Sequence, residues 1–412
     1  MARVVELPDP TDHEPIQGPR LRLRPVAADD LPLLMRWLAD PEVQEFYGLP
    51  PDSLAEAHDM YLAALDVPGW KFIVEDEGRP VGEIQYYHPY ESERWSAGID
   101  LFIGEPGDRN RGLGTEAVRT LLQYLFETIG VNLVTIGPEP ANRRAIRSYE
   151  KVGFRKDAFV RRTFKVDDRW VDAMHMTMLN EEWPAAKARW EAETGVAPSG
   201  TAPTQAPVRR DQVARLIELP DPTDHEPIQG PRVRLRPVTS EDLPLLLRWL
   251  ADPGVQEFCG LPPASLAEVH DTYLVAEDVP CWCFIIEEEG HPVGEIQYWY
   301  PYASECWSAG IDIFIGAAGD RDRGLGTEAV RTLLQHLFEI KGVNRATIDP
   351  EVGNRRAIRV YQRAGYRIDG VIRRNDRVDD RWVDAVHMTI LDEEWPAAKK
   401  AWDTETGWSP AG

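Results

Sequence analysis

Residues 109–115 read RNRGLGT, and residues 321–327 read RDRGLGT. Each heptapeptide follows an apolar stretch typical of a strand and precedes a long pattern typical of a helix. Glycine in such a turn lets the backbone approach a ligand closely, and the free N–H groups at the start of a helix bind anions. The arginines add charge-assisted contacts to phosphate. The turn therefore predicts a phosphate-binding site in each half of the chain.

The same turn could also have a purely structural role. A short Gly-x-Gly pattern alone is often only a tight turn before a helix. Neither heptapeptide has the Gly-x-x-x-x-Gly-Lys-Ser/Thr pattern, which argues against a mononucleotide P-loop. The position between a strand and a helix, together with the arginines, favours the phosphate site.

The two heptapeptides belong to a longer repeat. The pentapeptide at residues 6–10 recurs at residues 218–222, an offset of 218 − 6 = 212 residues. The tripeptide at residues 98–100 recurs with the same offset, so no insertion or deletion separates these points. A period this long corresponds to a whole domain rather than a solenoid unit. The chain is therefore a tandem duplication.

Residues between the copies are rich in proline and in small side chains, which is typical of a semi-extended linker. The sequence predicts a first domain at residues 1–195, a linker at residues 196–212 and a second domain at residues 213–412. The alternative is an ordered segment that bridges two docked domains. The two halves are expected to dock as an intramolecular pseudo-dimer.

The hydrophobic periodicity of the first copy predicts a mixed order of elements. Strands are expected near residues 20–24, 71–75, 81–87, 97–104, 131–136, 159–164 and 169–178, and helices near residues 29–38, 113–126, 143–151 and 183–190. This order predicts an α+β fold with a mixed, mostly antiparallel sheet flanked by helices.

Composition limits the function classes. The net charge of −23 disfavours nucleic acid, because binding phosphates needs a basic patch, and it favours attraction of cations. An acidic surface that only keeps the protein dissolved is the alternative. No apolar run approaches the roughly 20 residues that span a bilayer. The N-terminus lacks an apolar signal region, so we expect a cytoplasmic protein that does not bind a membrane.

The cysteines occur only in the second copy. Cys259, Cys281, Cys283 and Cys306 stand where the first copy has Tyr47, Gly69, Lys71 and Arg94. A fold that is built once without cysteine needs no disulfide framework, so we expect free thiols. Too few histidines and cysteines lie near the Cys-x-Cys pair for a zinc site, and no metal is expected.

The Arg-x-x-Gly-x-Gly pattern resembles the GNAT superfamily of N-acetyltransferases, whose acetyl-CoA site carries Arg/Gln-x-x-Gly-x-Gly/Ala. A second segment, from Asn142 through Tyr149 to Phe154, looks like the late Asn…Tyr…Gly-Phe segment of that family, and it recurs from Asn354 to Tyr366. The resemblance covers essentially all of both copies. It implies acetyl-CoA as cosubstrate and an amine as acceptor.

The resemblance also implies which residues bind the cosubstrate. The pantetheine arm would pair with the strand before the turn, and the pyrophosphate would lie on the turn. The implied residues of the first copy are Leu101, Phe102, Ile103, Arg109, Arg111, Gly112, Gly114, Thr115 and Asn142. Those of the second copy are Ile313, Phe314, Ile315, Arg321, Arg323, Gly324, Gly326, Thr327 and Asn354.

Two pairs of residues are the candidate catalytic groups. Tyr149 and Tyr361 occupy the position of the family's general acid, although a core aromatic on a helix would have the same pattern. Asp100 and Asp312 lie inside apolar strands, where a carboxylate needs a partner. A salt bridge to arginine is one explanation, and we favour a ligand ammonium. Because an ordinary aspartate has a pKa of about 3.9, we assign amine binding first and proton removal second.

Within the superfamily, each copy resembles the aminoglycoside 6′-N-acetyltransferases. The resemblance implies acetylation of a small polycationic amine and resistance to the antibiotic. Its substrate residues would be Tyr47, Gln85, Tyr87 and Asp100 in the first copy and Gln297, Trp299, Asp312 and Asp349 in the second. Aromatic faces and carboxylates suit a polycationic sugar.

The copies depart from that pattern in different places. Asp349 is present in the second copy, but the first copy has Gly137 there, and Tyr47 is replaced by Cys259 in the second copy. We therefore expect the two sites to differ in specificity. A largely structural role for one copy is the alternative.

Three further functions are compatible with parts of these motifs. A lysine- or hydroxylysine-type acyltransferase of siderophore biosynthesis is a sister group, which by resemblance tends to carry histidine where this chain has Asp100 and Asp312. A protein N-terminal acetyltransferase is the second, and a non-catalytic acyl-CoA or drug-binding module is the third. Retention of both tyrosines argues against the last. His175 and His387 are predicted to be packed or surface residues rather than catalytic ones.

Overall fold

The computed structural model describes residues 13–63, 69–88, 95–166, 169–195, 225–275, 281–300, 307–378 and 381–407, together with the backbone of β1 (Val4–Pro8) and β10 (Val213–Glu218). Contacts between Cα atoms divide the chain into a unit of Glu6–Leu216 and a unit that contains Ile217–Gly412. The predicted linker at residues 196–212 lies outside the described residues, and so does Cys306. The first copy is defined here as residues 13–195 and the second copy as residues 225–407.

The strands of the first copy are β2 (Ile16–Gln17), β3 (Leu21–Pro25), β4 (Gly69–Asp76), β5 (Arg79–Tyr87), β6 (Ser96–Ile103), β7 (Leu133–Ile136), β8 (Arg155–Val166) and β9 (Arg169–Leu179). Its helices are α1 (Leu31–Leu38), α2 (Pro41–Tyr47), α3 (Leu54–Leu62), α4 (Leu113–Tyr124), α5 (Arg143–Val152) and α6 (Trp183–Thr194). A π-helical turn, Leu125–Ile129, continues α4.

The second copy repeats these elements. Its strands are β11 (Ile228–Gln229), β12 (Val233–Pro237), β13 (Cys281–Glu288), β14 (His291–Trp299), β15 (Ser308–Ile315), β16 (Arg345–Ile348), β17 (Arg367–Val378) and β18 (Arg381–Leu391). Its helices are α7 (Leu243–Leu250), α8 (Pro253–Cys259), α9 (Leu266–Leu274), α10 (Leu325–Gln335), α11 (Arg355–Ala364) and α12 (Trp395–Thr406).

The sheet of each copy is mostly antiparallel. Its order in the first copy is β2-β3-β4-β5-β6-β7-β9-β8, and in the second copy it is β11-β12-β13-β14-β15-β16-β18-β17. Among the described strands of the first copy, only β6 and β7 pair in parallel, and β15 and β16 repeat this in the second. The predicted α+β fold with a mixed, mostly antiparallel sheet is confirmed.

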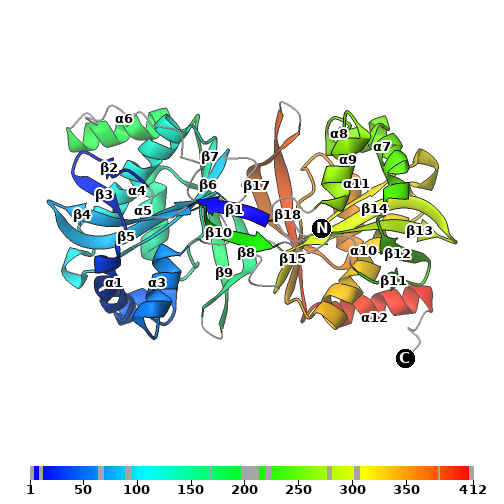
Figure 1. The fold of residues 1–412 in the computed structure, drawn as a ribbon, viewed down its shortest axis with the longest axis horizontal. Helices are drawn as coiled ribbons and strands as arrows, with labels where there is room; N and C mark the ends of the chain where they lie inside the picture. The colour runs from blue at the N-terminus through cyan, green and yellow to red at the C-terminus, as the bar shows by residue number, and fades with distance from the viewer. Residues whose placement is uncertain are drawn as a thin grey trace. The chain divides into compact units, whose positions relative to one another are not determined.

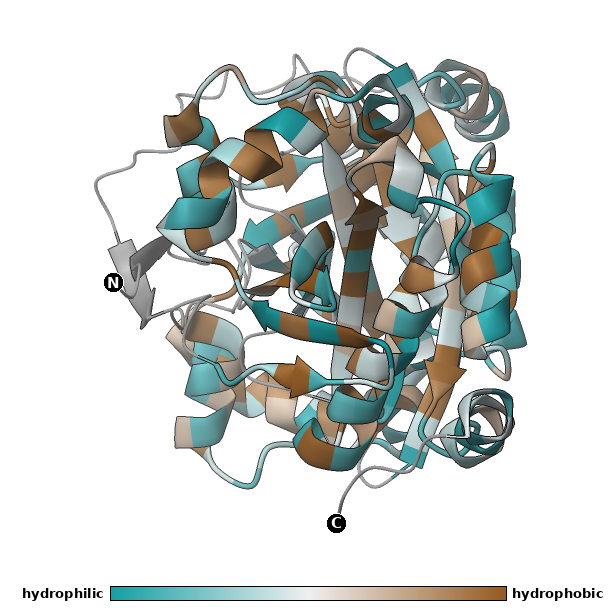
Figure 2. Cartoon of the chain, turned by 90° about the vertical axis from the view of Figure 1, so that its right-hand side faces the viewer, coloured by the Kyte–Doolittle hydropathy of each residue, from teal (hydrophilic) through white to brown (hydrophobic). Residues whose placement is uncertain are grey.

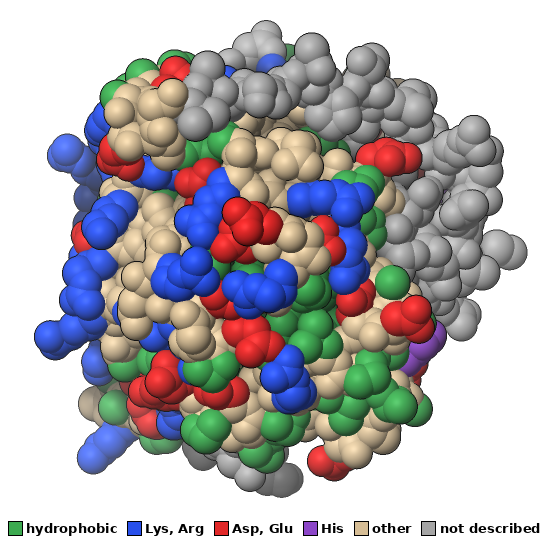
Figure 3. Space-filling view, turned by 90° about the vertical axis from the view of Figure 1, so that its left-hand side faces the viewer, with side chains coloured by type: hydrophobic (Ala, Val, Ile, Leu, Met, Phe, Trp, Pro, Cys, Tyr) green, Lys and Arg blue, Asp and Glu red, His purple; other side chains and the backbone are tan. Residues whose placement is uncertain are grey.

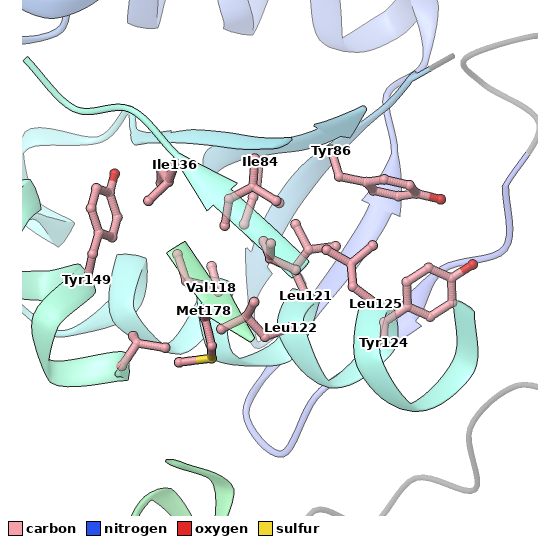
Figure 4. Close-up of a cluster of buried hydrophobic side chains, with 14 of the residues drawn as sticks. Ile84, Tyr86, Val118, Leu121, Leu122, Tyr124, Leu125, Ile136, Tyr149 and Met178 are labelled. Atoms are coloured by element: carbon pink, nitrogen blue, oxygen red, sulfur yellow. The ribbon is translucent and has the colours of Figure 1, made fainter. Parts of the chain in front are cut away.

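Helices cover both faces of the first sheet (Figure 1). One face packs on α4, α5 and α6 around Phe72, Ile84, Leu121 and Met178. Figure 4 shows the leucines of α4 gathered beneath Ile84, with Tyr149 at the edge of this cluster. The opposite face packs on α1, α2 and α3. Because successive side chains of a strand point to opposite faces, Phe72 and its neighbour Ile73 join different clusters.

The second copy has the same two-sided core, built around Phe284 and Leu333 on one face and Trp249 and Ile285 on the other. In Figure 2, its helices carry brown apolar segments beside teal polar ones, as amphipathic helices on a sheet do. Within the described residues no helix is both long enough and apolar enough to cross a membrane.

Charged side chains on the sheet surface are largely paired. Arg24 bonds Asp30 at 2.6 Å and Glu75 at 2.8 Å, and Arg20 bonds Asp76 at 2.8 Å. Figure 3 shows basic and acidic side chains interspersed over one side of the first copy. The negative net charge is therefore not spread as a uniform acidic surface.

The sequence patterns missed two helices of each copy. The pair Asp40-Pro41 ends α1 and also starts α2, because the Asp40 side chain caps the N–H of Glu42 at 2.9 Å. The short amphipathic pattern of α3 gave no clear signal, although Ser53 caps its start. Both helices cover the sheet face that carries the candidate site.

Candidate active site

Strand β6 has an open edge beyond its first residues. Its parallel pairing with β7 covers Ser96–Gly98, and the last pair is Gly98 with Thr135. Residues 101–103 therefore lie past the paired stretch and offer backbone groups on that side. The second copy repeats the geometry, with Gly310 and Thr347 as the last pair before Ile313–Ile315. An extended ligand can pair with such an edge as an added strand.

The predicted glycine turn lies directly beyond this open edge. Gly112 has φ +81° and stands at the start of α4, and Gly324 has the same φ at the start of α10. A residue with a side chain rarely adopts this conformation, so glycine is required here. No side chain caps either helix. The first N–H groups of α4 and α10 are thus placed to bind an anion.

The guanidinium of Arg109 forms hydrogen bonds with other groups of the protein. It donates to the carbonyl oxygens of Ile103 and Gly104 at 3.1 and 2.9 Å and to Asp40 at 3.0 Å, and its side chain is 6% exposed. Arg321 makes the equivalent bonds to Ile315, Gly316 and Asp252. These arginines fix the end of the strand against α2 or α8, and Arg321 also lines the pocket described below.

The second arginine of the turn is more accessible. Arg111 pairs with Asp108, and Arg323 bonds Asp320 at 2.9 Å and Glu288 at 2.5 Å. Nearly half of each arginine side chain is exposed. Only the arginine side of each pair is exposed, since Asp108 is buried and Asp320 and Glu288 are partly buried, so the accessible guanidiniums are the groups that a phosphate can reach.

A pocket of about 640 Å³ follows the turn of the second copy. The predicted cosubstrate and catalytic residues that line it are Ile313, Phe314, Ile315, Arg321, Gly324, Gly326, Thr327, Asn354 and Tyr361. The predicted residues outside its lining are Gln297, Trp299, Asp312, Arg323 and Asp349. Arg355, Arg356, Arg359 and Arg363 of α11 also line it, so one wall is strongly basic. This wall suits the phosphates of a nucleotide-like ligand.

The predicted tyrosines are buried. Tyr149 is 7% exposed and packs beside Phe154, and Tyr361 is 6% exposed beside Tyr366. Burial and the charge of Asp100 raise the pKa of Tyr149, and burial and the charge of Asp312 raise the pKa of Tyr361. Both hydroxyls therefore keep their protons at neutral pH and can donate them.

Three neighbouring strands place polar side chains in one line, which we call the central row. In the first copy it consists of Lys71, Gln85 and Asp100, because Lys71 faces Gln85 and Gln85 faces Asp100 in the strand register. The Gln85 amide lies 3.5 Å from the Asp100 carboxylate. Burial raises the pKa of Asp100 to about 6, while Gln85 and Lys71 act to lower it.

The central row of the second copy consists of Cys283, Gln297 and Asp312. The Cys283 thiol lies 3.3 Å from the Gln297 carbonyl oxygen, and Cys281 lies 3.8 Å from Cys283. The protein surrounding Asp312 and the negative charges of Asp349 and Asp376 raise its pKa to about 7, although the residue is exposed on β15 and its carboxylate can therefore be reached from solvent. Among the described residues no arginine forms an ion pair with either aspartate of the two rows, and Gln85 and Gln297 are the hydrogen-bonding neighbours instead.

A second buried carboxylate lies beside each row. Glu83 and Glu295 are each 2% exposed, and one oxygen of each has no hydrogen-bond partner among the described residues. Burial raises the pKa of Glu83 to about 8, although the charge of Lys71 opposes this. Burial raises the pKa of Glu295 well above its ordinary range, with added repulsion from Asp312. The sequence patterns did not reveal either glutamate.

Aromatic side chains border the rows. The ring of Tyr87 lies so close over Gly98 that a Cβ there would meet it at 2.4 Å, and Trp299 covers Gly310 in the same way. Tyr47 of α2 packs on Phe102, and it is 37% exposed. The surrounding protein and the charges of Asp100 and Glu83 raise its pKa, although more than a third of the residue is exposed. Cys259 takes its place in the second copy and lines the pocket.

Asn142 and Asn354 have a structural role, since each side chain accepts the N–H of the third helical residue at 3.0 Å. They cap the helices that carry Tyr149 and Tyr361. Asn354 also lines the pocket, so the cap of α11 lies at the wall of the site.

Asp349 has a partner that the sequence did not reveal. Nδ1 of the buried His387 lies 2.5 Å from its carboxylate. His387 is packed, as predicted, and it also orients a predicted substrate residue. The first copy has His175 and Gly137 at these positions, so the pair cannot form there. Asp376 likewise stands where the first copy has Phe164, and its charge reaches Asp312.

The described cysteines, Cys259, Cys281 and Cys283, are free thiols. Within the described residues no group of three or more His, Cys, Asp or Glu side chains is arranged to hold a metal ion.

Both copies are similar in sequence to known proteins. The family model described as an acetyltransferase (GNAT) domain matches residues 20–155 and 232–367. The aminoglycoside N(6′)-acetyltransferase type 1 of Klebsiella pneumoniae is 32% identical over 153 residues, which cover 34% of this chain and 76% of that protein. The uncharacterized N-acetyltransferase p20 of Bacillus licheniformis is 26% identical over 178 residues, 41% of this chain and 98% of that protein. The crystal structure of AAC(6′)-Ib with coenzyme A is 29% identical, with a TM-score of 0.36, over 40% of this chain and 98% of that chain.

Proposed function

This chain belongs to the acetyltransferase (GNAT) family and is an N-acetyltransferase, and we propose that it acetylates a small polycationic amine with acetyl-CoA as the donor. The amine we propose is an aminoglycoside, modified at its 6′ amine, so that the protein would confer resistance to the antibiotic. Each copy is proposed to form its own acetyltransferase domain, with residues 196–212 as the linker.

The observation that carries the proposal is the group of carboxylates in the second copy. Asp312 lies one residue before the open edge of β15, and the charges of Asp349 and Asp376 act on it. Three acidic groups close together repel one another, and a ligand with several ammonium groups relieves this repulsion. The relative from Klebsiella pneumoniae, named as an aminoglycoside N(6′)-acetyltransferase, further supports this acceptor.

The proposed mechanism assigns each step to residues of the second copy. The pantetheine arm pairs with Ile313–Ile315, and the pyrophosphate binds at the start of α10. The amine nitrogen attacks the thioester carbonyl, so an N–C bond forms and the C–S bond breaks. The departing thiolate takes the proton of the Tyr361 hydroxyl, and the surplus proton on nitrogen passes to Asp312, directly or through water. With a pKa of about 7, Asp312 is a far better base than an ordinary aspartate.

The experiment is a substrate screen on the full chain. Acetyl-CoA is offered with an aminoglycoside, a lysine derivative and a peptide with a free N-terminus, and release of the coenzyme thiol is measured. We expect turnover with the aminoglycoside. Turnover with the lysine derivative or the peptide alone would contradict the proposed acceptor, and the site of acetylation follows from the product's mass and NMR spectra.

A further inference from the structure

Lys71 is a buried cation in the central row of the first copy. Its side chain lies in β4 between apolar neighbours, and the residue is 7% exposed. Its Nζ atom donates to the carbonyl oxygen of Met60 at 2.5 Å and lies 4.7 Å from the centroid of the Tyr61 ring. A carbonyl oxygen and an aromatic face are groups that hold an ammonium ion. The two helix residues belong to α3, which closes over this face of the sheet.

The position of Lys71 is unusual for a structural lysine. A partly buried lysine normally extends its stem along apolar surface and keeps its charge in water. Lys71 instead keeps its charge beneath α3, on the row where Gln85 separates it from Asp100, and the charges of Glu83 and Asp100 act on it. Burial lowers the pKa of Lys71, while the charges of Glu83 and Asp100 act to raise it. Lys71 therefore acts as an internal counterion for these acids.

The second copy lacks this counterion. Cys283 stands at the position of Lys71, and a thiol carries no positive charge. Glu83 and Glu295 each leave one oxygen without a hydrogen-bond partner among the described residues, so this feature is common to both copies. Asp312, by contrast, has gained the acidic neighbours Asp349 and Asp376. The second copy thus has added negative charge, and no lysine, at the place where the first copy holds an ammonium group of its own.

We propose that Lys71 fills the ammonium subsite of the first copy and thereby excludes polycationic acceptors from it, so that only the second copy binds them. The inference rests on the proposed function for the choice of acceptor. It adds that Lys71 decides which copy binds this acceptor. A second ammonium ion that entered beside Lys71 would meet a like charge at close range, which at about 6 Å weakens binding by roughly a hundredfold.

The test counts binding sites on the full chain. An aminoglycoside is titrated calorimetrically into the protein saturated with coenzyme A. The wild-type chain is compared with Lys71→Met, which removes the charge, and with Lys71→Arg, which keeps it. The reciprocal pair is Cys283→Lys, which adds the charge to the second copy, and Cys283→Met, which fills similar space without charge. Thermal unfolding of each variant checks that it is folded.

We expect one site in the wild type, two in Lys71→Met and one in Lys71→Arg. Cys283→Lys should weaken the remaining site roughly a hundredfold, and Cys283→Met far less. Two sites in the wild type, or one site in both the wild type and Lys71→Met, would overturn the role of Lys71, and so would equal weakening by Cys283→Lys and Cys283→Met. No site in the wild type with one site in Lys71→Met would refute the proposed acceptor for the second copy but support the role of Lys71. No site in any variant would refute both.

Discussion

The two copies share their scaffold contacts and differ where a substrate would bind. Arg24 with Asp30 and Arg236 with Asp242 form the same pair, at 2.6 and 2.7 Å. The indole of Trp190 bonds Glu116 at 3.1 Å, and its repeat in the second copy keeps that distance. By contrast, Lys71, Gly137 and Phe164 of the first copy are replaced by Cys283, Asp349 and Asp376. These three replacements change the charge around the candidate acceptor site, while the framework contacts named above are kept.

Each of these replacements makes the site of the second copy more negative than that of the first. The central row of the first copy and its neighbour Glu83 combine two carboxylates with one ammonium group. The matching positions of the second copy hold two carboxylates, Asp312 and Glu295, and no lysine, and Asp349 and Asp376 add two carboxylates where the first copy has Gly137 and Phe164. Asp349 and Asp376 act to raise the pKa of Asp312, whereas Lys71 acts to lower that of Asp100. A duplicated fold can thus keep two copies of one reaction centre and give them different acceptors.

The largest expected difference between the copies concerns the tyrosines. Tyr361→Phe should lower kcat for an aminoglycoside by about a hundredfold or more, because the thiolate loses its proton donor. Tyr149→Phe should change this rate by less than about twofold. Steady-state thiol release from the two full-length variants is the measurement. Equal losses in both variants would mean that the copies share the substrate.

The next effect concerns amine binding. Asp312→Asn should raise KM for the aminoglycoside by roughly tenfold to a hundredfold, since a charge-assisted contact with the ammonium group is lost. The affinity for acetyl-CoA, measured by calorimetry, should stay unchanged. Asp100→Asn is the matched control and should leave KM for the aminoglycoside unchanged. An unchanged KM in Asp312→Asn would make the aspartate a structural group only.

The next prediction concerns the pH dependence of kcat/KM, which should also follow from Asp312 of the second copy. Binding of a cation requires ionised Asp312, so kcat/KM for the aminoglycoside should rise about tenfold per pH unit up to about pH 7 and then level off. The native pKa lies above the ordinary value of 3.8, so the folded state holds this proton more tightly than the unfolded state. The contribution of Asp312 to the free energy of unfolding should therefore decrease as pH rises from about 4 to 7. Asp312→Asn should remove both effects, and a pH profile that keeps its slope in this variant would assign it to another group.

The smallest effect is expected at His387. His387→Ala removes the partner that orients Asp349, and we expect KM for the aminoglycoside to rise about threefold to tenfold. His175→Ala alters the matched position of the first copy, where Gly137 replaces the aspartate, and should have no effect on this substrate. Similar changes in both variants would point to a loss of packing rather than to the orientation of Asp349.

Much of the fold follows from patterns that are local in sequence. The glycine turn, the strand before it and the helix after it are encoded by neighbouring residues, and the structure has them where the alternation and the turn predict. The capped helix that carries Tyr149 is equally local. The short α2 was missed because Asp40 both ends one helix and begins the next. A residue pattern that ends a helix does not by itself indicate that another helix follows.

The charges of the site were harder to predict. Lys71 and Glu83 are single charges within apolar strands, and only the register of β4, β5 and β6 brings them beside Asp100. The bond from Lys71 to Met60 depends on α3, whose signal was weak. Asp376 and His387 reach the site through β17 and β18, far along the chain. The sequence did contain one usable sign, since Lys71 and Asp376 each differ in charge from the matching residue of the other copy.

The open edge of β6 and β15 also has a consequence for the free protein. Amide protons that point to the unpaired edge, those of Leu101, Ile103, Ile313 and Ile315, should exchange with deuterium faster than those that point to β5 and β14, because the latter are bonded to a neighbouring strand. An occupant of this edge closes the gap as an extra strand would, and it stabilises the folded chain by mass action. Each half would then report its own occupancy as slower local exchange, even when no product is formed.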